Sequence, residues 1–436
     1  MRIEQDEVQS RIMQVLDVML EEWDDELDEP VEPESKLVED VGFASIDFVQ
    51  LAVAIEAEFK MKMGFQTLLM QDGAYVEDLS IAEVSAFVFD KVNSVGSPDT
   101  QPAPQQKVAP NVDRLESVES KVTREKMDEF RSIIRPCLPR ENDGGEKNRP
   151  AVFVLSPPRS GSTLLRIMLA GCPQLFVPPE LHLLSYADMS ERLAALDNTH
   201  NRHLLEGTIR ALMQLKGWDA ETARAFCSDS EAQKQSCKSF YDLLQKEAGE
   251  ALLVDKTPTY AVNKQILDRA EEDFQDAKYI HLVRHPCGTM RSYEESKLTR
   301  MMPLMNESDF SGRELAEMTW LTCHQNTFDF TKGIPENRYL QVQYEKIVQQ
   351  PEVEMRRICE FLDVPYHPDM INPYQDNEQR MADGVDAASK MSGDLKFHLH
   401  QGIDPAAAFR WQEFYSENIL GDITKEVARK CGYDIK

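Results

Sequence analysis

The stretch AVFVLSPPRSGSTLLR, residues 151–166, decides the fold of the larger part of the chain. The apolar run 151–156 predicts a short buried strand, and LLRIML, which begins at residue 164, predicts a helix. The Pro-, Ser- and Gly-rich residues between them resemble a turn that holds an anion at a helix N-terminus. The lysine of a nucleoside-triphosphate loop is missing, and Arg159 stands earlier in the turn. The sequence therefore predicts an anion-binding loop of another kind.

Further short apolar runs follow this loop and predict strands at 175–179, 251–257, 278–285 and 338–345, with helical segments between them. Strands that alternate with helices predict a P-loop-like α/β domain, in which helices cover both faces of a parallel sheet. In such a sheet, ligands bind at the carboxyl ends of the strands.

The overall composition excludes several classes of protein. The chain has 436 residues and a formal net charge of −28, which argues against nucleic-acid binding as a main role. Its eight cysteines show neither disulfide spacing nor a metal-ligand pattern, so we expect reduced thiols and no bound metal. The polar, acidic N-terminus and the lack of a long apolar run lead us to expect a cytoplasmic protein without a membrane span.

A change in composition divides the chain. Residues 95–110 are rich in Pro and Gln and predict a flexible linker. They separate a small domain, 1–94, from a large domain, 111–436, whose core begins at about residue 150. The small domain is the more acidic, with 23 Asp and Glu against 6 Lys and Arg over residues 1–91.

The small domain is predicted to be all-α, with three or four short helices. One helix is expected to start at Ser45 in VEDVGFASIDFVQLAVAIE, and another to be capped by Ser80. By its size, acidity and the residues around Ser45, the domain resembles acyl carrier proteins, although Ala44 replaces their usual acidic residue. The resemblance implies a four-helix fold and 4′-phosphopantetheine on Ser45. The alternative for Ser45 is a simple helix N-cap.

A second basic site is predicted in the large domain. Arg284 closes the strand 278–285, and Ser292 follows eight residues later on a helix. Arg284 alone could be a strand-end ion pair, and Ser292 alone a surface residue. Together with Arg159 they imply a ligand with two separate anionic groups.

The two sites resemble those of sulfotransferases that use 3′-phosphoadenosine 5′-phosphosulfate (PAPS). In that family a P-x-[RK]-S-G-[ST]-[ST] loop binds the 5′-phosphosulfate, and an Arg with a Ser eight residues on binds the 3′-phosphate. Residues 343–364 and RWQEFYSENI, with Arg410 and Trp411, also resemble late segments of the family. The resemblance implies a PAPS site formed by Arg159, Ser160, Gly161, Ser162, Thr163, Arg284, Ser292 and Arg410.

The resemblance also implies catalytic roles. Arg159 and Lys256, in VDKTPTY, would offset charge on the leaving phosphate, although Lys256 could be only an exposed strand-end lysine. Glu180 stands where such enzymes have a proposed base, and His182 could share or take that role. Two further histidines in the predicted strand 278–285, His281 and His285, are expected to be structural.

A carrier domain fused to a sulfotransferase resembles the pair found in polyketide synthases that form terminal alkenes. We therefore expect sulfation of a hydroxyl, such as the β-hydroxyl, on an acyl chain held by Ser45. The expected partners are a phosphopantetheinyl transferase, upstream polyketide or fatty-acyl synthase modules and a separate thioesterase. Three alternatives stay open: a free small-molecule acceptor, a P-loop kinase-like enzyme, and a non-catalytic docking protein.

Overall fold

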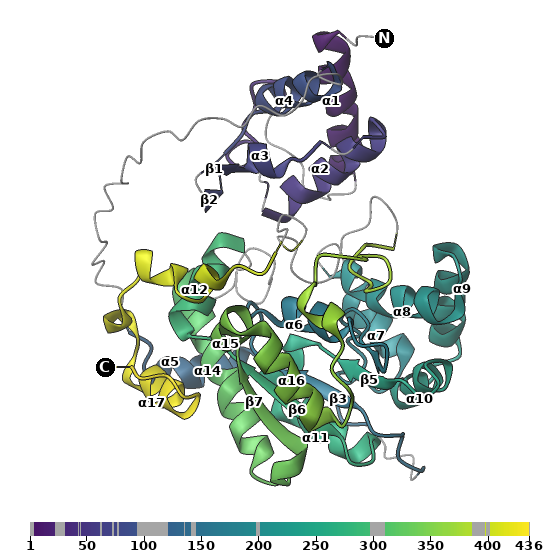
Figure 1. Ribbon diagram of the computed structural model, residues 1–436, viewed down its shortest axis with the longest axis vertical. Helices are drawn as coiled ribbons and strands as arrows, with labels where there is room; N and C mark the ends of the chain where they lie inside the picture. The colour runs from purple at the N-terminus through teal and green to yellow at the C-terminus, as the bar shows by residue number, and fades with distance from the viewer. Residues whose placement is uncertain are drawn as a thin grey trace. The chain divides into compact units, whose positions relative to one another are not determined.

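The structure is a computed structural model that divides into two compact units, Met1–Glu119 and Ser120–Lys436. Each unit is described by itself (Figure 1). The described residues are 4–21, 31–41, 43, 45–61, 63–71, 74–75, 78–93, 121–134, 136–140, 145–197, 201–296, 310–385, 397 and 402–435. The linker predicted at 95–110 and the side chain of Ser45 lie outside them.

The N-terminal unit is helical, as predicted. Its elements are α1 (Gln5–Glu21), α2 (Ser45–Glu58), α3 (Gln66–Leu69), the strands β1 (Met70–Gln71) and β2 (Ala74–Tyr75), and α4 (Ile81–Asn93). Val8, Ile12 and Leu16 of α1 are buried at helical spacing, as are Leu51 and Ile55 of α2. At the start of α4, the Ser80 hydroxyl and the Glu83 carboxylate each accept the other residue's backbone N–H, which forms a capping box.

The larger unit contains the predicted parallel sheet. All five predicted strands are present, although each is shorter than expected: β3 (Val152–Leu155), β4 (Leu175–Phe176), β5 (Leu252–Asp255), β6 (Lys278–Val283) and β7 (Tyr339–Gln343). They lie in the order β4-β5-β3-β6-β7, and every pairing is parallel. Because β3 is central, its neighbours β5 and β6 bring their carboxyl ends to the loop that follows it.

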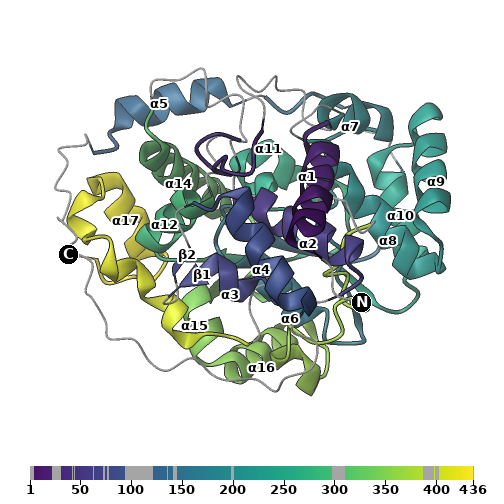
Figure 2. The same ribbon diagram turned by 90° about the horizontal axis from the view of Figure 1, so that it is seen from above.

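Helices cover both faces of this sheet. Since side chains alternate between the two faces along each strand, each strand contributes to two apolar clusters. Val152 and Val154 of β3 pack with α6 (Ser162–Leu169), α15 (Tyr344–Gln349) and α16 (Pro351–Leu362) on one face. Phe153 and Leu155 pack on the other face with residues of α7 (Met189–Leu196), α8 (Glu206–Lys216), α9 (Ala220–Ala232), α10 (Cys237–Glu247) and α11 (Lys264–Asp273). Figures 1 and 2 both place α8, α9 and α10 together at one end of this unit.

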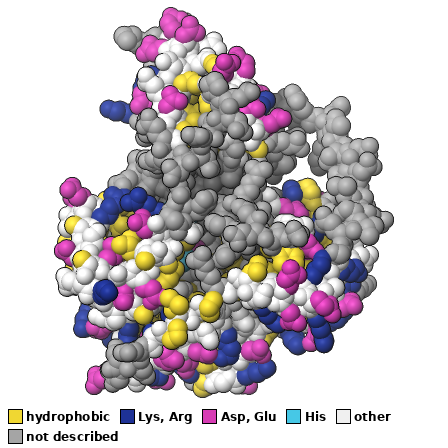
Figure 3. Space-filling view, turned by 180° about the vertical axis from the view of Figure 1, so that it is seen from behind, with side chains coloured by type: hydrophobic (Ala, Val, Ile, Leu, Met, Phe, Trp, Pro, Cys, Tyr) yellow, Lys and Arg dark blue, Asp and Glu magenta, His cyan; other side chains and the backbone are white. Residues whose placement is uncertain are grey.

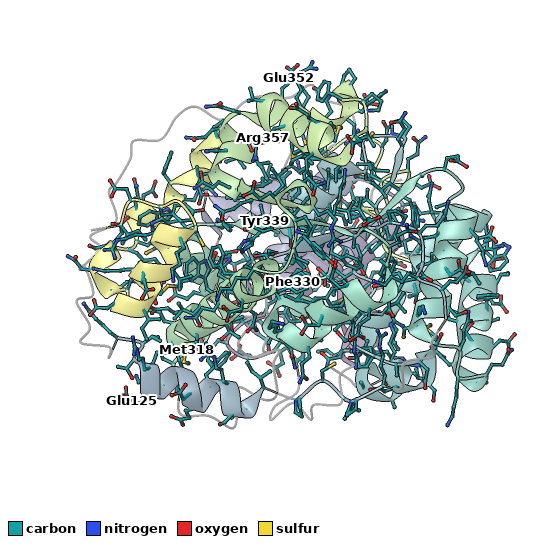
Figure 4. The ribbon with its side chains drawn as sticks, turned by 90° about the horizontal axis from the view of Figure 1, so that it is seen from below. Glu125, Met318, Phe330, Tyr339, Glu352 and Arg357 are labelled. Carbon is teal, nitrogen blue, oxygen red and sulfur yellow. The ribbon has the colours of Figure 1, made fainter. Side chains whose placement is uncertain are left out.

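A third apolar cluster lies beyond the β6 and β7 side of the sheet. It joins residues of α5 (Arg124–Ile133), α12 (Pro286–Ser296), α14 (Gly312–Thr331) and α17 (Asp422–Lys430) around the buried Trp320. In Figure 4, Glu125 on α5 and Glu352 on α16 lie at opposite edges of the unit, and Phe330 of α14 lies in its interior. Short 3₁₀ turns complete the chain at Arg202–Leu205, Pro258–Val262, Glu336–Arg338, Pro368–Ile371, Pro405–Ala408, Arg410–Glu413 and Glu417–Ile419.

The surface of the larger unit mixes the two signs of charge. In Figure 3, basic and acidic side chains alternate over its described face. Over the described residues, no helix is both long and apolar enough to cross a membrane. All eight cysteines lie in this unit and carry free thiols, and seven of them are buried.

Candidate active site

The loop between β3 and α6 is built for close approach of an anion. Arg159 and Gly161 both adopt left-handed backbone conformations, with φ of 64° and 83°, which turn the chain from the strand into the helix. A Cβ atom at position 161 would lie 2.3 Å from Cδ2 of Tyr344, so only glycine fits there. Directly after the turn, the first N–H groups of α6 have no partner within the helix, and the helix dipole favours an anion there.

Two hydroxyls in this loop lack hydrogen-bond partners. Both Ser156 and Ser160 are buried, and neither Oγ atom has a partner among the described residues. A buried hydroxyl without a partner costs free energy, so such groups are expected where a ligand completes the hydrogen bonding. The loop therefore fits an anionic group that accepts hydrogen bonds from these hydroxyls.

The two basic sites predicted from the sequence meet in the structure. Arg159 Nε donates to the Ser292 hydroxyl at 3.1 Å, and Arg284 Nη1 donates to the carbonyl of Arg159 at 2.8 Å. The Arg284 guanidinium also stacks 4.4 Å from the centre of the Tyr344 ring. All three predicted side chains are partly exposed, in a region where most neighbouring residues are buried. These contacts bring two cations and a hydroxyl together beside the loop that follows β3.

Of the C-terminal RWQEFYSENI segment, Trp411 and Glu417 contact this region, and Oε1 of Glu417 lies 3.2 Å from Nε2 of His285. The Trp411 ring stacks on His285 with centroids 4.0 Å apart, and Gly288 lies between Trp411 and Arg284. Arg410 instead pairs with Asp404 at 2.5 Å. Burial, and then the Arg284 charge, lower the pKa of His285 to about 4, so the ring packs as a neutral group.

A second cluster, at the carboxyl end of β5, joins Glu180, His182 and Lys256. The Lys256 ammonium lies 2.5 Å from Oε1 of Glu180, and Nε2 of His182 lies 3.4 Å from Oε2. The side chains are 1%, 13% and 5% exposed for Lys256, Glu180 and His182 respectively. Lys256 is therefore a buried ion-pair partner and not an exposed strand-end lysine. Because β5 pairs in parallel with β3, this cluster lies at the same edge of the sheet as the loop after β3.

The charges of this cluster influence one another. Burial alone would raise the pKa of the Glu180 carboxyl, but Lys256 and His182 together hold it well below its usual value. Burial lowers the pKa of Lys256, and Glu180 only partly opposes this effect. The cluster therefore couples a carboxylate of reduced basicity to a buried ammonium group.

Sequence reasoning missed Arg166 and Gly207. Arg166, an arginine within the apolar LLRIML run, is buried and donates to the carbonyls of Val177, Arg380 and Met381. Burial lowers its pKa to about 10, and its charge acts on both Glu180 and Lys256. At Gly207 on α8, a Cβ atom would lie 1.9 Å from the Glu180 carbonyl oxygen. A charge inside an apolar helix was the available signal for Arg166, whereas nothing in the sequence marked Gly207.

Among the described residues, no group of three or more His, Cys, Asp or Glu side chains is arranged to hold a metal ion.

Comparisons with known proteins identify the family of the chain. The model of the sulfotransferase family matches residues 150–368. The sulfotransferase domain from the curacin biosynthetic pathway is 37% identical, covers 67% of this chain and 100% of its own, and superposes with a TM-score of 0.62. The sulfotransferase domain of the Synechococcus PCC 7002 olefin synthase is 36% identical, covers 68% of this chain and 99% of its own, and superposes with a TM-score of 0.60. Protein-tyrosine sulfotransferase A of Caenorhabditis elegans is 25% identical over 307 residues, 68% of this chain and 70% of that relative. The chain belongs to the sulfotransferase family, and it is a PAPS-dependent sulfotransferase.

Proposed function

We propose that this enzyme transfers the sulfuryl group of PAPS to the β-hydroxyl of an acyl chain, which is held on 4′-phosphopantetheine at Ser45. The proposal treats residues 1–94 as an acyl carrier domain, 95–110 as a flexible linker and 111–436 as the sulfotransferase domain. The observation that carries it is the pairing of Lys256 with Glu180 and His182 at the same sheet edge as the anion-binding loop.

The chain's own residues divide the work between two halves of the site. The loop 157–163 and Arg159 would hold the 5′-phosphosulfate, and Arg284 with Ser292 would hold the 3′-phosphate. Bound there, the donor supplies the sulfuryl group and a phosphate leaving group. Lys256 and Arg159 would offset the negative charge that grows on the leaving phosphate, as electrostatic catalysis requires.

On the acceptor side, His182 would take the proton of the attacking hydroxyl while Glu180 orients it. Lys256 and His182 hold the pKa of the Glu180 carboxyl well below its usual value, so this carboxylate is a weak base. Histidine is the side chain that most often serves as a general acid or base in enzymes. Nε2 of His182 lies 3.4 Å from Oε2 of Glu180, and Nδ1 lies 3.5 Å from Oγ1 of Thr259.

Three observations support the carrier-bound acceptor. The N-terminal unit is helical and acidic, α2 begins at Ser45, and a phosphodiester at a helix N-terminus is favoured by the helix dipole. The similar domains come from a biosynthetic pathway and an olefin synthase, whose names favour polyketide or fatty-acyl synthase modules as upstream partners. A phosphopantetheinyl transferase and a separate thioesterase would complete the sequence of reactions.

Two alternatives from the sequence are wrong, because the chain belongs to the sulfotransferase family: a P-loop kinase and a non-catalytic docking protein. A free small-molecule acceptor is the competing hypothesis. Attachment by a short flexible linker gives an effective acceptor concentration on the order of millimolar. A 3-hydroxyacyl group attached at Ser45 should therefore be sulfated faster than the same acyl group on free pantetheine. The two rates should become equal only when the free thioester is present at millimolar concentration.

The experiment compares these two acceptors at equal micromolar concentration, with PAPS in excess. The proposal predicts much faster sulfation of the attached group, and no sulfation of Ser45→Ala protein after the same loading treatment. Equal rates for the attached and the free thioester would favour the free acceptor instead.

A further inference from the structure

The segment that carries Glu180 and His182 is held by side chains from a different strand end. The backbone N–H groups of Leu181 and His182 donate to the Thr257 hydroxyl at 3.2 and 3.5 Å. Those of Leu183 and Leu184 donate to the Tyr260 hydroxyl at 3.0 and 3.2 Å. Four consecutive amides, which belong to no helix or strand, are thus satisfied by two hydroxyls of the VDKTPTY sequence.

Both hydroxyls donate to one buried carboxylate, that of Asp255. Thr257 Oγ1 lies 2.8 Å from Oδ1, and the Tyr260 hydroxyl lies 3.0 Å from Oδ2. Both Asp255 oxygens act as acceptors here, and each hydroxyl has a single proton to donate. The protons of the two hydroxyls therefore point toward the carboxylate. The lone pairs of the hydroxyl oxygens then accept hydrogen bonds from the backbone N–H groups of 181–184.

The held segment is strained and confined on its other side. His182 has a φ of 50°, a left-handed conformation that a residue with a side chain seldom adopts without restraint from its surroundings. The Leu181 carbonyl accepts from Nε of Arg192 at 3.0 Å, and Gly207 lies against the Glu180 carbonyl. This backbone conformation sets where the Glu180 and His182 side chains begin.

We infer that Asp255, Thr257 and Tyr260 are positioning residues, which fix Glu180 and His182 relative to Lys256. Lys256 stands between Asp255 and Thr257 in the chain, so one network holds both the ammonium and the carboxylate that it pairs with. The inference deepens the proposed function and rests on it, since it assigns no contact with substrate to these three residues. Their effect on the reaction is exerted through the segment 180–184.

The structure offers a matched control for this role. Tyr241 is also fully buried, and its hydroxyl donates to Oδ2 of Asp255 at 2.5 Å. Within the described residues, that hydroxyl contacts the carboxylate and Tyr260 but no atom of 180–184. Loss of the Tyr241 hydroxyl therefore perturbs the same buried network without releasing an amide of the held segment.

The experiment measures kcat and the Kd of adenosine 3′,5′-bisphosphate for Thr257→Val, Thr257→Ser, Tyr260→Phe and Tyr241→Phe in the full-length chain. A shift of the reacting groups by about 1 Å costs roughly 100-fold in rate. Thr257→Val and Tyr260→Phe should lower kcat by about this factor, with Kd changed by less than about threefold. Thr257→Ser keeps the hydroxyl and should restore most of kcat, and Tyr241→Phe should keep kcat near that of the wild type.

Bisphosphate binding with an unchanged Kd shows that a slow variant is folded. A wild-type kcat for Thr257→Val, or an equal loss for Tyr241→Phe and Tyr260→Phe, would overturn the positioning role. If Thr257→Val does not fold, the comparison of Tyr260→Phe with Tyr241→Phe decides alone. Failure of the wild type to sulfate the carrier-bound acceptor contradicts the proposed function instead. In that case kcat is measured with whichever hydroxyl the wild type does sulfate.

Discussion

The Nζ atom of Lys256 lies 2.5 Å from Oε1 of Glu180, and the lysine side chain is only 1% exposed. Removal of one member of a buried ion pair leaves an uncompensated charge and typically costs about 3 kcal/mol or more. Lys256→Met should therefore lower the free energy of unfolding by about this amount, as measured by urea denaturation. The double variant Lys256→Met/Glu180→Gln removes both charges and should recover much of the loss. Equal destabilisation of the single and double variants would show that the pair is not what holds this site.

Substitutions at two glycines should affect the donor half and the acceptor half of the site separately. Gly161→Ala places a Cβ atom against Tyr344 at a positive φ and should weaken binding of adenosine 3′,5′-bisphosphate about tenfold. Gly207→Ala places one against the Glu180 carbonyl and should lower kcat by roughly 100-fold while bisphosphate binding is kept. Gly402→Ala, where a Cβ atom would meet nothing within 4 Å, is the control. Calorimetric titration and steady-state turnover measure the two effects, and a reversed assignment would contradict the division of the site.

Arg284 is expected to distinguish nucleotides that carry a 3′-phosphate. Lysine cannot reproduce the fork that contacts the Arg159 carbonyl and stacks on Tyr344. Arg284→Lys should weaken binding of adenosine 3′,5′-bisphosphate by about 10- to 100-fold, the range for a hydrogen bond to a charged group. Binding of 5′-AMP, which lacks the 3′-phosphate, should change much less. Equal losses for the two nucleotides would place Arg284 outside the 3′-phosphate site.

Buried histidines should make the larger unit sensitive to acid. Burial lowers the pKa of His281 to about 3, and burial with Arg284 lowers that of His285 to about 4. An unfolded histidine titrates near about 6.5, so the unfolded chain binds more protons between about pH 6.5 and about pH 4. Stability is therefore lost as the pH falls through this window.

The variant His285→Gln isolates one of these contributions. It should be less stable than the wild type near neutral pH, because it loses the stacking on Trp411. Its free energy of unfolding should then fall less between about pH 7 and about pH 4.5, by up to about 3 kcal/mol, than that of the wild type. Parallel pH dependences of the two proteins would show that His285 takes up its proton equally in the folded and unfolded states.

The strands and the anion-binding loop could be predicted because short apolar runs end at polar residues. Each strand was predicted a little too long, because residues such as Lys256 and Arg284 directly follow the apolar run but lie outside the observed strands. The meeting of Arg159 with Arg284 and Ser292 followed from the parallel sheet, which brings the strand ends to one edge.

Other features of the site depend on contacts between distant parts of the chain, which the sequence pattern does not show. Thr257 and Tyr260 looked like ordinary turn residues, and only the fold places the amides of 181–184 against their hydroxyls. The donor-site role of Arg410 stays a prediction; its guanidinium pairs with Asp404, and its neighbour Trp411 packs against His285. The role of Ser45 stays a prediction, because its side chain lies outside the described residues.

The most direct test of the central claim is the intact mass of the holo chain after loading with a 3-hydroxyacyl group and incubation with PAPS. The loaded wild type should gain the mass of one SO₃ group on the phosphopantetheine arm. Ser45→Ala should gain none, and Lys256→Met should gain it far more slowly. A loaded wild type that gains no mass while it sulfates a free alcohol would contradict the account.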